Sequence, residues 1–186
     1  MHTHDKPHHG YRRIKAGIAL VAVAALTAVA AVPADAGDGG TGASATKAPV
    51  GHAKLVHGRA IAPSNAPWKV RKVIAAANHI RNKPYVYGGG HGSWQDNGYD
   101  CSGSVSYALH GGRLLRSPLD SSGFMRWARG GKGHWITVYS NPSHAFMVVA
   151  GLRFDTSQTA GNGPGWSKNI HAERLSDFRK RHKARY

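Results

Sequence analysis

The sequence has little acid and a single cysteine. Its 186 residues include nine Asp and Glu against 25 Lys and Arg, which gives a formal net charge of +16 at pH 7. The one cysteine, Cys101, excludes an internal disulfide framework and any Cys-rich zinc or iron–sulfur site. The excess of positive charge favours acidic polymers as non-specific partners: nucleic acid, anionic lipid, or wall polymers bearing phosphate or carboxylate. The length fits one domain and leaves no room for a multidomain enzyme.

The sequence also lacks a long apolar run. The run of apolar and small residues at 16–32 has 17 residues, whereas a helix that crosses a bilayer needs roughly 20. Arg12 and Arg13 precede this run, and Ala34-Asp35-Ala36 follows it. A charged start, a hydrophobic middle and an A-x-A end are typical of a secretory signal peptide. We therefore expect residues 1–36 to be a cleaved signal, after which no integral membrane span remains; the alternative is retention as an N-terminal membrane anchor.

Composition divides the rest of the chain into a linker and one domain. Residues 37–67 are rich in Gly, Ala, Ser, Thr and Pro without a sustained apolar period, which is typical of a flexible linker. From Trp68 onward, apolar residues recur at helical spacing as far as Ile80, and Pro84 follows. We expect a domain over 68–186. Its remaining expected elements are a helix opening near Cys101, a short helix at 122–129, strands at 135–139, 145–150 and 152–156, and a basic tail at 174–185.

Cys101 is the first candidate for chemistry. Asp100 precedes it and fits a helix N-cap, so the thiol is expected in the first turn of a helix. Free backbone N–H groups and the positive end of the helix dipole favour a thiolate there. Ser102 and Gly103 are small enough to let a substrate carbonyl approach the sulfur. The alternative is that Cys101 is a small buried apolar residue.

A thiolate nucleophile needs a partner that protonates the leaving group, and two histidines compete for this role. His134 precedes the first expected strand, and His144 precedes the second. If Ala150-Gly151 is a two-residue hairpin loop, Asp155 lies on the same face as His144 and diagonal to it, within reach of its imidazole. Asp155 would then orient the ring, as the third member of a triad does. We favour His144 over His134 for this reason.

Two motifs resemble those of the NlpC-type cell-wall endopeptidases, which are papain-like cysteine peptidases of bacterial peptidoglycan. They are Lys83-Pro84-Tyr85-Val86-Tyr87-Gly88-Gly89 and Asp100-Cys101-Ser102-Gly103, in this order after an amphipathic helix. The resemblance covers about residues 68–157. It implies a small α+β papain-like fold, with the helix of the nucleophile packed on an antiparallel β-sheet. It also implies Cys101 as nucleophile, His144 as base, Asp155 as the residue that orients it, and Tyr85 beside the nucleophile.

The leading hypothesis is therefore a secreted, wall-associated bacterial cysteine endopeptidase that cleaves peptidoglycan stem peptides. The resemblance implies cleavage between D-glutamate and diaminopimelate, and no metal or cofactor. The alternative is a catalytically inactive wall-binding module on the same fold, since Gly133-His134 stands where the family usually has Gly-Asp and Asp155 comes one position early. A nucleic-acid partner is not expected, because the signal segment argues against it and no nucleic-acid-binding motif is present.

Further residues are candidates for binding. We expect Tyr85, Ser102 and Trp94 to line the substrate cleft, Trp94 because it lies in a polar loop. Basic residues outside the motifs are candidates for holding anionic cell-wall polymers, with a solvated surface as the alternative. They are Arg113, Arg116, Arg126, Arg129, Lys132 and the basic tail.

Overall fold

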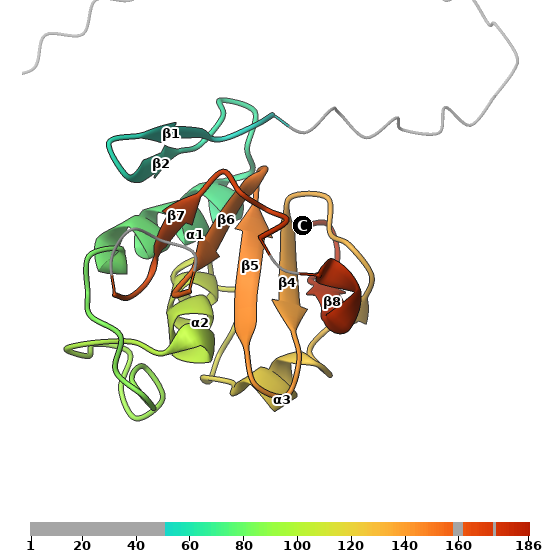
Figure 1. Ribbon diagram of the computed structural model, residues 1–186. Coiled ribbons are helices and arrows are strands. Elements are labelled where there is room, and N and C mark those ends of the chain that lie inside the picture. Colours follow the sequence, from blue (N-terminus) through green and yellow to red (C-terminus); the bar gives the residue numbers. More distant parts are fainter. Residues whose placement is uncertain (1–50, 158–161, 173) are drawn as a thin grey trace, which may run out of the picture. The chain divides into compact units, whose positions relative to one another are not determined.

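The computed structural model describes residues 51–157, 162–172 and 174–186 (Figure 1). The helices are α1 (Trp68–Ile80), α2 (Cys101–Gly111), α3 (Ser121–Phe124) and the short 3-10 helix η1 (Leu175–Asp177). The strands are β1 (Lys54–Val56), β2 (Arg59–Ile61), β3 (Arg129–Gly130), β4 (Ile136–Ser140), β5 (Ala145–Val149), β6 (Leu152–Asp155), β7 (Gly165–Ser167) and β8 (Arg179–His182). β1 and β2 form a hairpin, and the other six form an antiparallel sheet in the order β3-β8-β4-β5-β6-β7.

Helices α1 and α2 pack on each other and on the half of the sheet formed by β5, β6 and β7 (Figure 1). The apolar positions predicted for α1, from Val70 to Ile80, are buried as expected. The two helices come very close at the end of α2, where a Cβ on Gly111 would lie 2.4 Å from the Cβ of Ala76. Glycine at this position therefore permits the close packing of α2 on α1. The expected α+β fold, a helix bearing Cys101 packed on an antiparallel sheet, is confirmed.

The hairpin between β5 and β6 has the predicted two-residue loop. Ala150 and Gly151 both have positive φ, 47° and 83°, as the tight turns that match strand twist require. The register pairs Met147 with Phe154 and Val149 with Leu152. This register sets which side chains of β6 share a face with those of β5, and it places Asp155 on the face of His144.

The chain before α1 is ordered within the described residues. Residues 51–67, assigned above to a linker, contain the β1–β2 hairpin, whose turn has positive φ at His57 and Gly58. The hairpin is tied to α1 because the Asn78 side chain accepts from the Ala60 N–H at 3.0 Å and donates to its carbonyl at 2.8 Å. The folded domain therefore begins before Trp68. The expected signal peptide and residues 37–50 lie outside the described residues.

The expected basic tail is part of the sheet. Its residues 179–182 form β8, which lies between β3 and β4. The sequence Arg-Lys-Arg-His has no apolar alternation, so no strand was predicted there. Phe178, directly before β8, supplies the apolar anchor by packing on Phe146 of β5 with ring centroids 5.1 Å apart.

Candidate active site

The start of α2 is held by the side chain of Asp100. Asp100 Oδ1 accepts from the Gly103 N–H at 2.7 Å, as an N-cap does, and its Oδ2 accepts from the Gly88 N–H at 3.0 Å. The second bond joins the helix start to the glycine loop of the first motif. A Cβ on Gly103 would lie 2.0 Å from the carbonyl oxygen of Gly89, so only glycine fits there. The two sequence motifs thus meet in space and fix the position of Cys101, the first residue of α2.

His144 connects Cys101 to Asp155. His144 Nε2 lies 2.9 Å from Asp155 Oδ1, and the same imidazole lies beside the Cys101 thiol and lowers its pKa. Because Nε2 is engaged with Asp155, Nδ1 is the ring nitrogen available to the sulfur. The backbone N–H of His144 donates to Asn141 Oδ1 at 2.8 Å, which fixes the entry into β5. The structure therefore brings together the three residues expected to form a triad.

His134, the competing histidine, lies elsewhere. Its backbone N–H donates to the carbonyl of Tyr186 at 3.0 Å, and its ring packs edge-on against Trp135. It lines a cavity at the start of β4 that does not include Cys101. Of the two candidates, only His144 faces the thiol.

The surroundings of Cys101 favour the thiolate. The side chain is buried, with 8% exposed, and burial alone would raise the thiol pKa. Hydrogen bonds from His144, from the backbone N–H of Ala145 and from the Ser121 hydroxyl outweigh burial and lower the pKa below its usual value. The Ser121 oxygen lies 3.7 Å from Sγ. The sulfur is thus surrounded by donors that stabilise its charged form.

His144 and Asp155 are shifted in the complementary directions. Burial opposes charge on His144, but its hydrogen bonds with Asp155 and Cys101 raise its pKa to about 10. Burial also opposes charge on Asp155, but His144 and then Arg153 lower the pKa of this carboxyl to about 2. All three shifts favour the charged forms, namely a thiolate, an imidazolium and a carboxylate in sequence.

Arg153 supports Asp155 from within the core. Its side chain is fully buried, and Nε donates to Asp155 Oδ2 at 2.8 Å. Its guanidinium carbon lies 3.6 Å from the centroid of the Phe146 ring. The backbone N–H of Thr156 donates to Asp155 Oδ1 at 2.6 Å. The sequence analysis assigns no role to Arg153; a cation two positions before the carboxylate, and therefore on the same face of β6, is the signal that could have indicated one.

The thiol opens onto a cleft of about 530 Å³. Tyr85 and Ser102, both expected there, are among its lining residues. Burial, followed by the nearby Cys101 and Asp100, raises the pKa of Tyr85. Tyr87 also lines the cleft and is 91% exposed. The cleft is therefore bounded by the first motif on one side and by α2 on another.

His91 is a lining residue of the cleft that sequence reasoning missed. Its Nε2 lies 3.1 Å from Asp100 Oδ1 and 3.2 Å from Ser102 Oγ. Ser102 Oγ in turn donates to Asp100 Oδ1 at 3.2 Å. Ser102 is 3% exposed, so it acts as part of this polar cluster. Nothing in the spacing of the loop residues indicated that His91 returns to the helix start.

Trp94 was expected in the cleft, and the structure places it outside. Its ring stacks on His110, near the end of α2, with centroids 3.9 Å apart, and it is not among the residues that line the cleft. The loop is fixed there because Trp94 also offers its carbonyl to the Tyr99 hydroxyl at 2.7 Å. The side chain covers the helix instead of facing substrate.

In residues 51–157, 162–172 and 174–186, no group of three His, Cys, Asp or Glu side chains has a geometry that could hold a metal ion. Within the same ranges, no helix has both the length and the apolar content needed to cross a bilayer.

Comparison with known proteins identifies the fold. No family model and no curated protein sequence matches the chain. Among solved structures, the peptidoglycan hydrolase RipB of Mycobacterium tuberculosis is similar, with 22% identity, 68% of this chain and 70% of that chain covered, and a TM-score of 0.51. A P60 domain from an antigen of M. avium subspecies paratuberculosis has 21% identity, 61% and 94% coverage, and a TM-score of 0.48. An NlpC/P60 family protein from Bacillus cereus has 14% identity, 64% and 41% coverage, and a TM-score of 0.46.

The similarity to RipB places the chain in a structural class. Helices packed on a six-stranded antiparallel sheet, with Cys101 at the start of α2, form the fold of the NlpC/P60 peptidoglycan hydrolases. RipB, the similar structure with a TM-score of 0.51, is a peptidoglycan hydrolase.

Proposed function

We propose that the protein is an exported cysteine endopeptidase that cleaves peptide bonds in peptidoglycan stem peptides. The observation that carries the proposal is the series Cys101–His144–Asp155, in which the imidazole lies beside a thiol that lines a cleft and is hydrogen-bonded to a buried carboxylate. A thiol, a histidine and a group that orients the histidine are the parts that nucleophilic peptide cleavage needs.

Acylation is the first half of the reaction. The Cys101 thiolate attacks the scissile carbonyl carbon, and the carbonyl electron pair moves onto oxygen. The tetrahedral intermediate then collapses, the C–N bond breaks, and the imidazolium of His144 gives its proton to the departing amine. A thioester and a neutral imidazole remain.

Deacylation restores the starting state. Water attacks the thioester carbon while His144 takes one of its protons. The C–S bond breaks, the carboxylic acid product leaves, and the thiolate–imidazolium pair is regenerated. Asp155 keeps the imidazole oriented and favours its charged form in both halves, and Arg153 holds Asp155.

The first turn of α2 suits the developing negative charge. The Gly103 N–H is used by the Asp100 cap, whereas the N–H of Cys101 lies at the first helical position, where no helical carbonyl precedes it. Backbone donors at a helix start are pre-oriented and stabilise an oxyanion without reorganisation. We assign the Cys101 N–H to this role.

The substrate class rests on the fold and the motifs. RipB, which has the same fold, is a peptidoglycan hydrolase, and the family resembled by the motifs cleaves between D-glutamate and diaminopimelate. This proposal places the protein outside the cell at the wall, after removal of the signal peptide expected at residues 1–36. Peptidoglycan stem peptides are then its substrates, and anionic cell-wall polymers are its expected further partners.

A wall-binding module without activity is the second candidate. It is suggested by the departures from the family pattern at Gly133-His134 and by the early position of Asp155. The close approach of His144 to Asp155 favours the enzyme, because a binding module has no need of a buried carboxylate at 2.9 Å from the imidazole.

A synthetic stem tripeptide, L-alanyl-γ-D-glutamyl-diaminopimelate, tests the proposal. The full-length protein is expected to release diaminopimelate, and Cys101→Ala is expected to release none. Cys101→Ser serves as the matched control for side-chain volume. Release by Cys101→Ala at the wild-type rate, or no release by the wild type from the tripeptide and from longer stem peptides, would overturn the proposal.

A further inference from the structure

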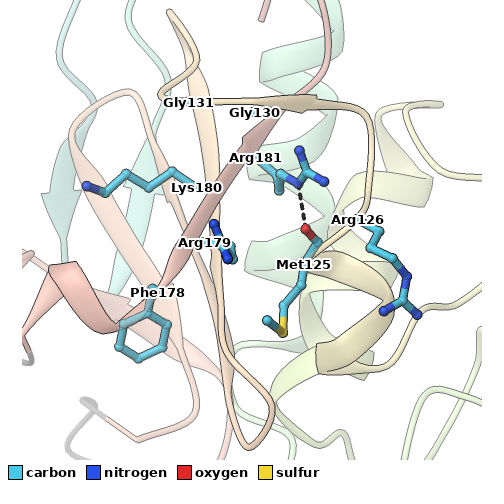
Figure 2. Close-up of a pocket in the computed structure, with 8 residues that line it drawn as sticks. All are labelled: Met125, Arg126, Gly130, Gly131, Phe178, Arg179, Lys180 and Arg181. Atoms are coloured by element: carbon cyan, nitrogen blue, oxygen red, sulfur yellow. Dashed lines mark hydrogen bonds between the residues drawn. The ribbon is translucent and has the colours of Figure 1, made fainter.

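A second cavity lies between β8, β3 and the turn that follows α3. Its volume is about 510 Å³, and Figure 2 shows the side chains that line it. Arg126 comes from the turn, and Arg179 and Arg181 come from β8. We call this cavity the arginine groove. It contains no carboxylate among its lining residues in the part of the chain that the structure describes.

The three guanidinium groups are presented in different ways. Arg181 is held in place, because its Nε donates to the carbonyl of Met125 at 2.7 Å (Figure 2). Arg126 and Arg179 are exposed. Lys180 also belongs to the lining, but its ammonium group points away from Arg181 in Figure 2, as strand alternation requires. The positive charge that faces the groove therefore comes from arginine side chains.

Within the part of the chain that the structure describes, these arginines form no ion pair. Among the described residues, no carboxylate lies within ion-pair distance of Arg126, Arg179 or Arg181. Three arginines that line one cavity raise the local positive potential. Each offers a planar fork of donors that matches the oxygen atoms of a phosphate. The chemistry of the groove thus suits an anion that bears phosphate oxygens.

We propose that the arginine groove binds a phosphodiester-bearing cell-wall polymer of the polyol phosphate type. Such a polymer is flexible and narrow, and its successive phosphates can reach the fixed Arg181 and the two exposed arginines in turn. This proposal names a binding site beyond the active-site cleft, and it uses the proposed location at the wall only to choose the source of the phosphate.

The lining of the groove argues against nucleic acid as its ligand. Single-stranded nucleic acid is held by stacking of bases on exposed aromatic rings. The aromatic residue of the groove, Phe178, is 8% exposed and packs on Phe146, so it offers no free ring face. A cavity of about 510 Å³ has the size of a small-molecule site, which suits a thin polymer chain and not a duplex.

The groove and the cleft share an element. Ser121 and Ser122 of α3 line the cleft, whereas Met125 and Arg126, which directly follow α3, line the groove. Phe178 also packs edge-on against the His144 ring, with centroids 6.4 Å apart. A polymer held in the groove therefore lies one short helix away from the cleft. In a wall where such polymers are attached to peptidoglycan, this contact holds the protein close to stem peptides.

Binding of a fluorescently labelled glycerol phosphate oligomer to the full-length protein tests this proposal. The double variant Arg126→Gln/Arg179→Gln is compared with Arg59→Gln/Arg71→Gln, which removes two equally exposed arginines from β2 and α1. At about 0.15 M salt we expect the groove variant to bind about tenfold more weakly, and the control variant to bind like the wild type. Lys180→Gln is expected to bind more tightly than Arg179→Gln.

Three results would overturn the proposal. Equal losses of binding affinity in the two double variants would show that the effect depends on net charge alone. Unchanged binding in the groove variant would remove the groove from the interaction. Tighter binding of a single-stranded DNA of matched charge, lost in the groove variant, would assign the groove to nucleic acid. If the double variant unfolds, Arg126→Gln alone, in an exposed turn, answers the same question. The oligomer contains no peptide bond, so these outcomes do not depend on peptidase activity.

Discussion

His144 Nε2 and Asp155 Oδ1 lie 2.9 Å apart, although 11 residues separate them in the chain. The two-residue turn at Ala150-Gly151 produces this contact, because it places β6 in a register that brings Asp155 to the face of His144. The contact raises the pKa of His144 and lowers that of Asp155. Since the same imidazole lies beside Cys101, the hairpin register contributes to the lowered pKa of the thiol.

The pH dependence of alkylation follows from these shifts. The Cys101 pKa is lowered, so the thiolate is present below the ordinary thiol value of 9.0, and it is lost as the pH falls through the lowered pKa. His144 keeps its proton until the pH rises through about 10. We expect Cys101 to react with iodoacetamide below pH 9, and kcat/KM to decline both on the acid side, where the thiolate is protonated, and on the alkaline side near pH 10, where His144 loses its proton. Alkylation rates and kcat/KM across the pH range check this. An alkylation midpoint at the ordinary thiol value would contradict it.

Substitutions at the two candidate histidines separate their roles. His144→Ala removes the acid–base group and should lower turnover by about 10³-fold. His134→Ala is the matched control, since His134 lies in a different cavity, and it should retain wild-type turnover. Asp155→Asn keeps the shape but not the charge, so it should lower turnover less than His144→Ala. The three rates on one stem-peptide substrate check these expectations. Wild-type turnover in Asp155→Ala would remove Asp155 from the mechanism.

Arg153 is expected to act on stability as well as on the active site. Its guanidinium and the Asp155 carboxylate are both buried, and loss of Arg153 removes the donors to Asp155 Oδ2 and leaves the buried carboxylate with His144 as its charged partner. Arg153→Met should therefore lower the free energy of unfolding by about 3–5 kcal/mol. Arg71→Met, on the exposed face of α1, should change it by no more than about 0.5 kcal/mol. Urea unfolding of both variants measures the difference. Equal stability of Arg153→Met and wild type would show that the buried pair contributes nothing.

The contact between the two motifs can be tested at Gly103. A Cβ there would meet the carbonyl oxygen of Gly89 at 2.0 Å, so Gly103→Ala must displace the glycine loop or the start of α2. We expect a loss of about 1–3 kcal/mol in unfolding free energy and a lower kcat/KM. Gly92→Ala is the control, because its Cβ would meet nothing within 4 Å. Gly103→Ala with wild-type stability and kcat/KM would refute the role of this contact.

Sequence preferences of helix caps and turns were sufficient to predict the elements that carry the triad. The capping preference of Asp100 predicted the start of α2, and the turn residues at 150–151 predicted the register of β5 and β6. Both depend on interactions between residues close in sequence. This is why His144 and Asp155 could be placed on one face before the fold was known.

Elements that depend on long-range contacts could not be predicted from these local preferences. The strand β8 has no apolar alternation, and it is a strand because Phe178 packs on Phe146 and its backbone pairs with β4. Trp94 stacks on His110 only because the loop folds back over α2. His91 reaches Asp100 for the same reason. The β1–β2 hairpin, too short to be stable alone, is tied to Asn78 of α1.

Digestion of purified peptidoglycan by the full-length protein tests the central claim most directly. Wild type and Cys101→Ala are incubated side by side, and the released fragments are identified by mass spectrometry. The account predicts new stem-peptide fragments from the wild type alone, ending at the D-glutamyl–diaminopimelate bond. An absence of fragments from both proteins, with both still sedimenting with the wall, would contradict it and favour the binding module.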